Sequence, residues 1–295
     1  MFLLIIINRE VYVKPEVGVS RTDLALEVHS QLQNEEGKVR GVEVENIVRS
    51  GGIKVNRIAI ETENAAKEMG RPRGNYITID FSESEKKGYK NKQPLVRILA
   101  QIIEEWTSHL TEKDGFTIGK QSDTDISVLV AGLGNAEEII DALGPKVVSR
   151  IPKSRHIMQE FGKYIFGSKE LSRISGIAPG VRDHTGMETQ EIIKGIVGEI
   201  EPDLIITIDA LVGKNQKRIG QTIQLTDAGI VPGSGVGVHR KAISKDSMGI
   251  PVISIGVPMV MDASYDFFLV PKDVTMKVEF LSEVIADGIE EAFRE

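Results

Sequence analysis

The chain has 295 residues, of which 41% are hydrophobic and 27% are charged, and its formal net charge is −7. This composition supports a sizeable core, and the negative charge argues against a protein that wraps nucleic acid. The lack of cysteine excludes disulfides, thiolate catalysis and cysteine metal sites and favours a reducing compartment. The apolar run from Phe2 to Ile7 is too short for a signal segment or a membrane span. We therefore expect a cytoplasmic protein without a membrane partner.

The first part of the chain begins with an irregular lead-in and continues with patterned segments. Residues 11–27 contain a Pro-Glu-Val-Gly turn signal. Apolar residues at helical spacing, with Pro94 in the first turn, predict an amphipathic helix at Leu95–Leu110. The remaining predicted elements are strands at Val42–Val48, Arg57–Glu61 and Tyr76–Asp80 and a short helix at Thr62–Met69. Together they predict an N-terminal strand and helix layer over residues 24–120.

Strands and helices alternate from residue 126 onward. Thr185 to Glu188 matches a capping box, which predicts a helix that runs to about Glu199. The other predicted elements are strands at Ile126–Ala131, Leu204–Ile208, Ile219–Leu225 and Val252–Ile255 and helices at Asp141–Arg150, Lys153–Phe166 and Val274–Phe293. This alternation predicts an α/β fold with a mainly parallel mixed sheet flanked by helices, of the phosphorylase/hydrolase-like kind. We expect residues 121–295 to form the core of a single domain with the N-terminal layer.

Functional residues in such sheets collect at the carboxyl ends of the strands. Three segments meet that condition, namely Gly132–Asp141, Asp209–Gly213 and Gly256–Asp262. The glycine-rich loop Pro232–Gly237 is a fourth candidate. We expect these segments to line one cleft.

The glycine loops do not match nucleotide or serine-hydrolase motifs. The turn at residues 132–135 lacks the third glycine of a dinucleotide site, because Glu137 stands in its place. The loop Pro232–Gly237 has neither the P-loop spacing nor that of a nucleophile elbow around Ser234. It can serve as a flexible rim of the cleft or bind the substrate backbone. A non-catalytic nucleotide-binding module is therefore a weak alternative.

The five histidines give little support for a zinc protease. No H-E-x-x-H motif occurs, and no two histidines are four residues apart. His184 and His239 fall in loops near the proposed cleft. We expect most of the histidines to be surface residues or hydrogen-bonded polar residues.

Two aspartates are the best candidates for chemistry. Asp209 follows a strand that is apolar on both faces, and burying an acid there is costly unless it is paired or protonated. Asp141 begins a predicted helix after the glycine turn. Asp141 could simply cap that helix, and Asp209 could bond a loop amide. If the two meet at neighbouring strand ends, they could share a proton and activate a water on a peptide carbonyl.

The chain resembles the spore germination protease family over most of residues 126–262. The matching segments, in order, are Val130–Asn135, Asp141–Val147, Ala178–Val181, Thr185–Gly195, Pro202–Leu204, Ile208–Leu211, Asp227–Ile230, Pro232–Gly237, Gly249–Val252 and Gly256–Pro258. The resemblance implies an endopeptidase that degrades small acid-soluble spore proteins during germination. It also implies that Asp141 and Asp209 are the catalytic aspartates, in a fold similar to hydrogenase maturation endopeptidases.

The same resemblance carries expectations about cofactors, partners and place. It implies a homotetramer in the cytoplasm of the forespore or spore core, with no nucleic acid partner and no cofactor. The related maturation enzymes use a nickel site, which leaves a metal-dependent hydrogenase-maturation-type endopeptidase as the alternative.

The segment from Ser20 to Glu27 resembles the self-cleavage site of the family. Its form is Thr, acid, apolar, Ala, any residue, Glu, which is also the form cut in the substrates. Cleavage would fall between Asp23 and Leu24, so that residues 1–23 form a propeptide and residues 24–295 the peptidase domain. The same residues also suit the start of a helix, with Thr22 as its cap and Glu27 in its second turn.

Further residues are assigned to the substrate cleft by position. We expect an extended substrate, bound through its backbone. Its proposed contacts are Gly134, Asn135, Gly233, Ser234, Gly235, His184 and Arg240. The acidic side chain before the cut bond needs a cation, for which Arg182, Arg240 and Lys241 are candidates. The chain departs from the family in its apolar start, its short segment at 262–274 and its charged turn at Val181–His184.

Overall fold

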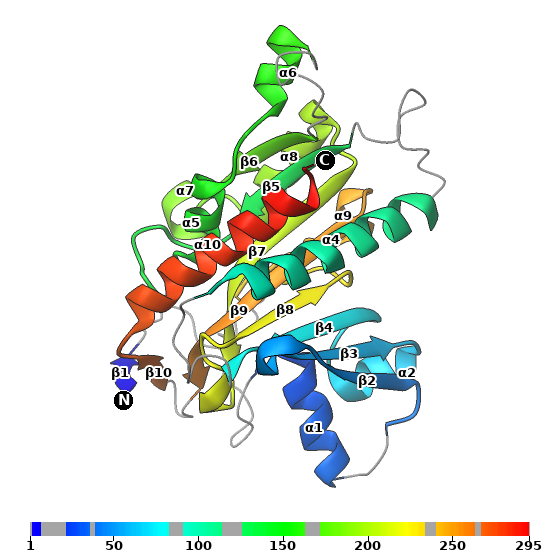
Figure 1. Ribbon diagram of the computed structural model, residues 1–295, viewed down its shortest axis with the longest axis vertical. Helices are drawn as coiled ribbons and strands as arrows, with labels where there is room; N and C mark the ends of the chain where they lie inside the picture. The colour runs from blue at the N-terminus through cyan, green and yellow to red at the C-terminus, as the bar shows by residue number, and fades with distance from the viewer. Residues whose placement is uncertain are drawn as a thin grey trace.

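The computed structural model describes residues 2–6, 22–35, 39–82, 91–113, 126–162, 172–233, 240–262 and 267–294. Within these ranges the fold is a mixed sheet of ten strands flanked by helices (Figure 1). The strands are β1 (Phe2–Ile6), β2 (Val42–Val48), β3 (Lys54–Ile60), β4 (Gly74–Asp80), β5 (Ser127–Gly132), β6 (Arg173–Ile177), β7 (Leu204–Gly213), β8 (Thr222–Thr226), β9 (Val252–Asp262) and β10 (Phe267–Pro271).

The helices of the described ranges connect and cover these strands. They are α1 (Ala25–Glu35), α2 (Glu63–Met69), α4 (Gln93–Lys113), α5 (Leu143–Arg150), α6 (Arg155–Phe161), α7 (Arg182–Thr185), α8 (Thr189–Ile200), α9 (Lys245–Met248) and α10 (Val274–Ala292), with 3-10 turns at Ser50–Gly52 and Gln216–Arg218. None of them is long and apolar enough to cross a membrane.

The strand order is β2-β3-β4-β8-β9-β7-β5-β6, with β10 paired to β9 and β1 paired to β10. The parallel pairings join β6, β5, β7 and β9, and the other pairings are antiparallel. The predicted α/β fold with helices around a mixed sheet is therefore confirmed. The parallel part is confined to four neighbouring strands, because from β9 through β8, β4, β3 and β2 each strand is antiparallel to the next.

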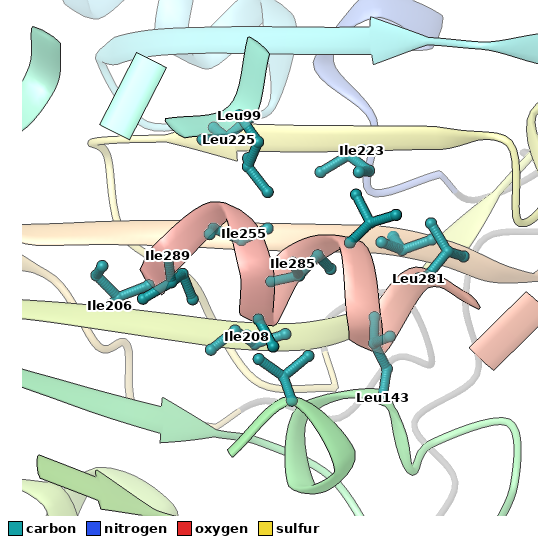
Figure 2. Close-up of a cluster of buried hydrophobic side chains, with 14 of the residues drawn as sticks. Leu99, Leu143, Ile206, Ile208, Ile223, Leu225, Ile255, Leu281, Ile285 and Ile289 are labelled. Carbon is teal, nitrogen blue, oxygen red and sulfur yellow. The ribbon is translucent and has the colours of Figure 1, made fainter. Parts of the chain in front are cut away.

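One face of the sheet carries the main apolar core. Helices α4 and α10 lie side by side on this face, and α5 packs beside α10 (Figure 1). Figure 2 shows isoleucines and leucines from the strands pointing toward the helix that carries Leu281, Ile285 and Ile289. Burial of such side chains contributes about 1.5–3 kcal/mol each, which makes this face the main source of stability.

The opposite face holds two smaller cores. Ile193 of α8 packs with Leu129 and Ile205 in one of them. In the other, Leu26 of α1 and Met69 of α2 pack against Ile58 of β3. These two cores cover the sheet from both sides of its centre, and the centre itself carries polar side chains.

The polar centre comes from the alternation of side chains along three adjacent strands. In β7, β8 and β9, one set of alternate residues is apolar and faces α4 and α10, and the other set faces the opposite side. That second set contains buried polar residues, which are Thr207, Asp209, Thr222, Gln224, Thr226 and Ser254. β7 is buried on both faces as expected, but its two faces differ in chemistry.

Most predicted elements are confirmed, with changes at their ends. β7 continues to Gly213, so Asp209 lies inside the strand and not after it. Helix α6 ends at Phe161 because Gly162 has a left-handed φ of 71°. Residues 163–166, which complete the predicted helix, lie outside the described ranges.

The predicted capping box at Thr185 is wrong. Thr185 ends the one-turn helix α7, because the next residue, Gly186, has a φ of 70° and breaks the helix. The capping box is formed instead by Glu188 and Glu191 at the start of α8. The glutamate side chain at the N-cap replaces the threonine hydroxyl that the sequence pattern suggested.

Candidate active site

Asp209 lies on the polar face of β7 with only 6% of its surface exposed. Its Oδ1 accepts a hydrogen bond from the Ala210 amide at 3.0 Å. Burial raises the pKa of the Asp209 carboxyl well above its usual range, and the negative charges of Asp141 and Asp23 raise it further. The positive charge of Arg240 only partly opposes this rise. The surroundings of Asp209 therefore favour the protonated form of its carboxyl group.

Asp141 stands in the turn between β5 and α5. Its Oδ2 accepts a hydrogen bond from the Asn135 amide at 2.8 Å, so the carboxyl closes the turn and does not cap α5, whose N-cap is Ala142. Burial raises the Asp141 pKa to about 6, against the opposing effects of the Asn135 amide and of Arg240. The raised pKa brings the ionisation of the Asp141 carboxyl into the mildly acidic range.

Close backbone packing brings the turn that carries Asp141 to β7. The Leu133 amide donates to the Ile208 carbonyl at 2.8 Å, directly before Asp209. A Cβ on Gly144 would lie 2.4 Å from the Leu133 oxygen, and one on Gly134 would lie 2.2 Å from the Asp141 carbonyl oxygen. Gly134 also has a φ of 105°, which favours glycine. The glycines thus let α5 and its preceding turn approach the strand ends.

Arg240 supplies the positive charge of the site. Its charge lowers the pKa of both Asp141 and Asp209, which places the guanidinium within the electrostatic reach of each carboxyl group. Its Nε is buried and makes no hydrogen bond with the described residues. Arg240 therefore acts on the pair through its charge.

The segment before α1 is bound across the end of β7. The Asp23 amide donates to the Val212 carbonyl at 2.7 Å, and the Val212 amide donates to Asp23 Oδ2 at 2.8 Å. Arg71 donates to the Thr22 carbonyl and lies 3.9 Å from the Asp23 carboxylate. Leu24 is fully buried. The two residues that flank the predicted cleavage point thus lie next to the strand that carries Asp209.

Glu27 occupies its own carboxylate site on the loop after β7. It accepts hydrogen bonds from the amides of Lys214 at 2.7 Å and Asn215 at 2.9 Å, and the Arg218 Nε lies 3.8 Å away. The Thr22 hydroxyl donates to the same carboxylate at 2.5 Å. Only 8% of Glu27 is exposed. Buried carboxylates held by amides and a guanidinium are among the stronger polar contacts in proteins.

Thr22 also accepts a hydrogen bond from the Leu24 amide at 3.1 Å, while α1 begins at Ala25. The segment does lie at a helix start, but the predicted positions within the helix are wrong: α1 begins three residues after Thr22, and Glu27 lies in its first turn. A helix that starts at Ala25 does not argue against cleavage between Asp23 and Leu24, because the proposed cleavage point lies just before the helix.

The other residues predicted for the cleft fall into three groups. Asn135, Gly134 and Arg240 lie with the two aspartates. Ser234, Gly235 and His239 lie outside the described residues, and Gly233, at their edge, has a φ of 69°. His184 is exposed on α7, where its amide donates to the Val181 carbonyl.

Two of the three cations proposed to read the acidic side chain bond elsewhere. Arg182 pairs with Glu188, and Lys241 pairs with Glu191, both at exposed positions. The cation beside Asp23 is Arg71, which nothing in the sequence marked. Gln224 was also missed, although a glutamine between the apolar Ile223 and Leu225 of a buried strand is a usable signal.

The described residues do not supply a metal site. No group of three or more His, Cys, Asp or Glu side chains in the described ranges is arranged to hold a metal ion. The cation that faces the aspartates is the guanidinium of Arg240. A surface hollow lined by Arg57, Tyr76 and Trp106 lies on β2–β4, and its lining includes none of the residues around Asp209.

The arrangement suits general acid and base chemistry. Two carboxyl groups that influence each other and whose pKa values are both raised can hold one proton and accept another. A peptide segment with its own acidic residues already lies beside them.

Comparison with known proteins places the site in a family context. The chain matches the sequence profile named Peptidase_A25, germination protease, over residues 18–265. It is 42% identical over 243 residues to the germination protease of Caldanaerobacter subterraneus, covering 82% of this chain and 69% of that protein. It is 39% identical over 245 residues to the germination protease of Bacillus cereus, which covers 82% of this chain and 63% of that protein. It is 39% identical over 247 residues to the germination protease of Clostridium perfringens, which covers 83% of this chain and 71% of that protein.

The chain thus spans between 63% and 71% of the length of these relatives. Among solved structures, it is similar to a NiFe hydrogenase maturation protease, HycI, from Thermococcus kodakarensis. That likeness has a TM-score of 0.33 at 20% sequence identity and covers 61% of this chain and 98% of the other.

Proposed function

Because the chain belongs to the germination protease family, a family of peptidases, we propose that it is an aspartate-dependent endopeptidase made as a self-processing zymogen. Asp141 and Asp209 are its catalytic residues, and the bond between Asp23 and Leu24 is the one that it cuts in itself. The observation that carries this proposal is the position of Asp23. Its backbone and carboxylate bind Val212, three residues after Asp209, and its charge acts on Asp209.

The two carboxyl groups divide the work according to their pKa values. Ionised Asp141 accepts a proton from a water molecule, whose oxygen bonds to the carbonyl carbon of Asp23. Protonated Asp209 gives its proton to the carbonyl oxygen, which yields a tetrahedral diol. Asp141 then gives its proton to the Leu24 nitrogen, the carbon–nitrogen bond breaks, and Asp209 regains a proton from one hydroxyl. The products are a carboxyl group on Asp23 and an amine on Leu24.

The acidic residues of the segment contribute to specificity. Val212 and Arg71 bind the side chain before the cut bond, and the loop at residues 214–218 binds the side chain of Glu27. The charge of Asp23 also raises the pKa of Asp209. An acidic residue before the cut bond therefore helps to keep the proposed acid protonated.

The substrates that fit this pattern are the small acid-soluble spore proteins, degraded when a spore germinates. The name of the relatives, germination protease, supports a role in germination. We propose further that the enzyme works as a homotetramer in the cytoplasm of the forespore and spore core. Light scattering on the purified chain tests the subunit number.

Self-processing tests the function directly. Purified full-length chain is incubated from pH 5 to pH 8, and intact-mass spectrometry reads the new N-terminus. We expect a product that begins at Leu24, and we expect the Asp141→Asn and Asp209→Asn chains to stay full length. Asp203→Asn is a matched control on the carboxylate that binds the Ser127 amide. A wild-type chain that stays intact, or an Asp209→Asn chain that processes normally, would refute the proposal.

A further inference from the structure

Gln224 is a buried amide in the centre of the sheet. It lies in β8 with 5% of its surface exposed, on the same face as Asp209. An amide buried so deeply is costly unless both of its ends are hydrogen-bonded. Both ends bond to the N-terminal segment: Nε2 donates to the Asp23 carbonyl oxygen at 3.1 Å, and Oε1 accepts from the Ala25 amide at 2.8 Å.

These two bonds bracket one peptide bond. The Asp23 carbonyl and the Leu24 nitrogen form the peptide unit that we propose is cut, and the Ala25 amide is the next donor along the chain. The amide side chain has one orientation in which both contacts form, because a carbonyl accepts and an amide N–H donates. Gln224 therefore holds the carbonyl oxygen with its donor end.

The strand register places Gln224 opposite the proposed acid. Gln224 pairs with Gly256 of β9, and Gly256 pairs with Asp209 of β7. Residues paired across strands point to the same face, and two strand spacings separate the backbones by roughly 10 Å. Gly256, which lies between them, has no side chain. Leu211 fills the space above Gly256, because a Cβ on this glycine would lie 2.4 Å from Leu211 Cδ1. Asp209 and Gln224 thus flank one strip of the polar face.

The attack of water moves electron density onto the carbonyl oxygen that Gln224 contacts, while Asp209 transfers its proton to that oxygen. A fixed donor aimed at that oxygen stabilises the transition state, and loss of one such donor lowers the rate by about 100-fold to 1000-fold. We propose that Gln224 binds and polarises the carbonyl oxygen of the peptide bond that is cut, in the chain's own segment and then in its substrates. This role rests on the proposed function of the two aspartates.

A purely structural role for Gln224 would use the other end of the side chain. The first amides of a helix lack partners within the helix, and Oε1 supplies one for Ala25 at the start of α1. Anchoring α1 requires only this acceptor. The donor on the Asp23 carbonyl is the part that catalysis requires, and the two parts are separable by substitution.

The experiment compares the self-processing rates of four full-length chains at pH 5 and pH 8: wild type, Gln224→Leu, Gln224→Glu and Thr222→Val. Glutamate keeps the acceptor for Ala25 in both protonation states. It can donate to the Asp23 carbonyl only when it is protonated. Thr222, two residues earlier on the same face of β8, is the matched control.

We expect Gln224→Leu to process about 100-fold or more slowly than wild type at both pH values. We expect Gln224→Glu to match that loss at pH 8 and to recover at least tenfold, relative to wild type, at pH 5. This recovery also shows that the variant is folded, and Thr222→Val should match wild type. Processing of Gln224→Leu within threefold of wild type, or a ratio of Gln224→Glu to wild type that is independent of pH, would overturn the role of Gln224. Failure of the wild-type chain to process would overturn the function of the aspartates as well.

Discussion

The two faces of β7 differ in what they contribute to the molecule. Ile206 and Ile208 point to α10 and join the main apolar core (Figure 2). Thr207 and Asp209, which alternate with them, point to the opposite side, where the N-terminal segment binds. One strand therefore carries part of the apolar core on one face and the proposed catalytic acid on the other. The cost of burying Asp209 is offset by the apolar face directly behind it.

This comparison explains why the site lies at the centre of the sheet. Exclusion of water raises the pKa of a carboxyl group, and Asp209 lies in β7, a strand buried along nearly its whole length. The pairing of β5 with β7 ends at Ile208, which leaves room for the Asp141 turn beside Asp209. The same burial that makes Asp209 unfavourable for stability makes it useful as an acid.

The largest expected effect is a gain in the free energy of unfolding when Asp209 is replaced by asparagine. The folded-state pKa of Asp209 is raised, so its contribution to stability is complete below the unfolded pKa and is lost as pH rises toward the folded pKa. Asparagine does not ionise and keeps that contribution. In the uncleavable Asp141→Asn background, we expect Asp209→Asn to add stability that grows with pH by up to about 1.4 kcal/mol per pH unit above pH 4.

Urea unfolding at pH 4, 5.5 and 7 measures this difference. The two proteins should be nearly equal at pH 4, and the double variant should be the more stable at pH 7. A double variant that is less stable at pH 7 would show that ionised Asp209 is well accommodated in the fold.

A pair of substitutions on adjacent residues compares the faces directly. Ile206→Ala leaves a cavity in the apolar core and should cost about 2–5 kcal/mol of unfolding free energy. Thr207→Val removes the hydrogen bond to Ser254 and should cost about 1–3 kcal/mol, because the Ser254 hydroxyl stays buried without that partner. Urea unfolding of both variants provides the test. If the two variants lost equal unfolding free energy, or if Thr207→Val lost more, the apolar face would not be the main source of stability.

Glu27→Gln should weaken the docking of the N-terminal segment. Its amide end places a donor against the Lys214 and Asn215 amides and gives up the charge beside Arg218. We expect self-processing to slow by about tenfold to 100-fold, which corresponds to the loss of a charge-assisted hydrogen bond. Glu43→Gln, at an exposed site on β2, is the control and should process normally. Unchanged processing by Glu27→Gln would show that the Glu27 carboxylate does not contribute to docking of the segment.

The smallest expected effect concerns Arg71. Arg71→Met removes the cation that lies 3.9 Å from the Asp23 carboxylate, a partly exposed pair of modest energy. We expect processing to slow by about threefold to tenfold. The advantage of Asp23, which is the ratio of the processing rate with Asp23 to that of the Asp23→Asn chain, should shrink by a similar factor. Arg73→Met, which loses only an exposed pair with Glu63, should keep that advantage. An undiminished advantage in Arg71→Met would contradict the assignment of Arg71 as a group that reads the acid.

Local patterns predicted the parts of the fold that depend on local physics. The helix at Leu95–Leu110 has a continuous apolar stripe, and the strand at Val42–Val48 has the composition of a β-strand, so both were identified within a few residues. The end of β7 was missed because Asp209 is a polar residue inside a strand, where a polar residue usually marks an end. The capping residue of α8 was missed because two acids compete with Thr185 for that role.

The residues of the candidate site likewise fall into those that local sequence patterns indicated and those that they did not. Asp141, Asp209, Asp23 and Glu27 belong to sequence motifs and were identified as candidates. Arg71 and Gln224 act through contacts with residues far away in the chain, since Gln224 meets Asp23 only when β8 lies beneath the N-terminal segment. Such contacts depend on the order of strands in the sheet, which local patterns do not determine.

The pKa of Asp209 is the most direct measure of whether Asp141 and Asp209 act as one unit. Carbon-13 NMR of the aspartate carboxyl groups can follow Asp209 in the wild-type chain and in Asp141→Asn. We expect Asp209 to titrate well above its ordinary range in wild type and at lower pH once the charge of Asp141 is removed, with Asp141 itself titrating near pH 6. Titration of both groups near the ordinary aspartate value of about 4, unaffected by the substitution, would contradict the account.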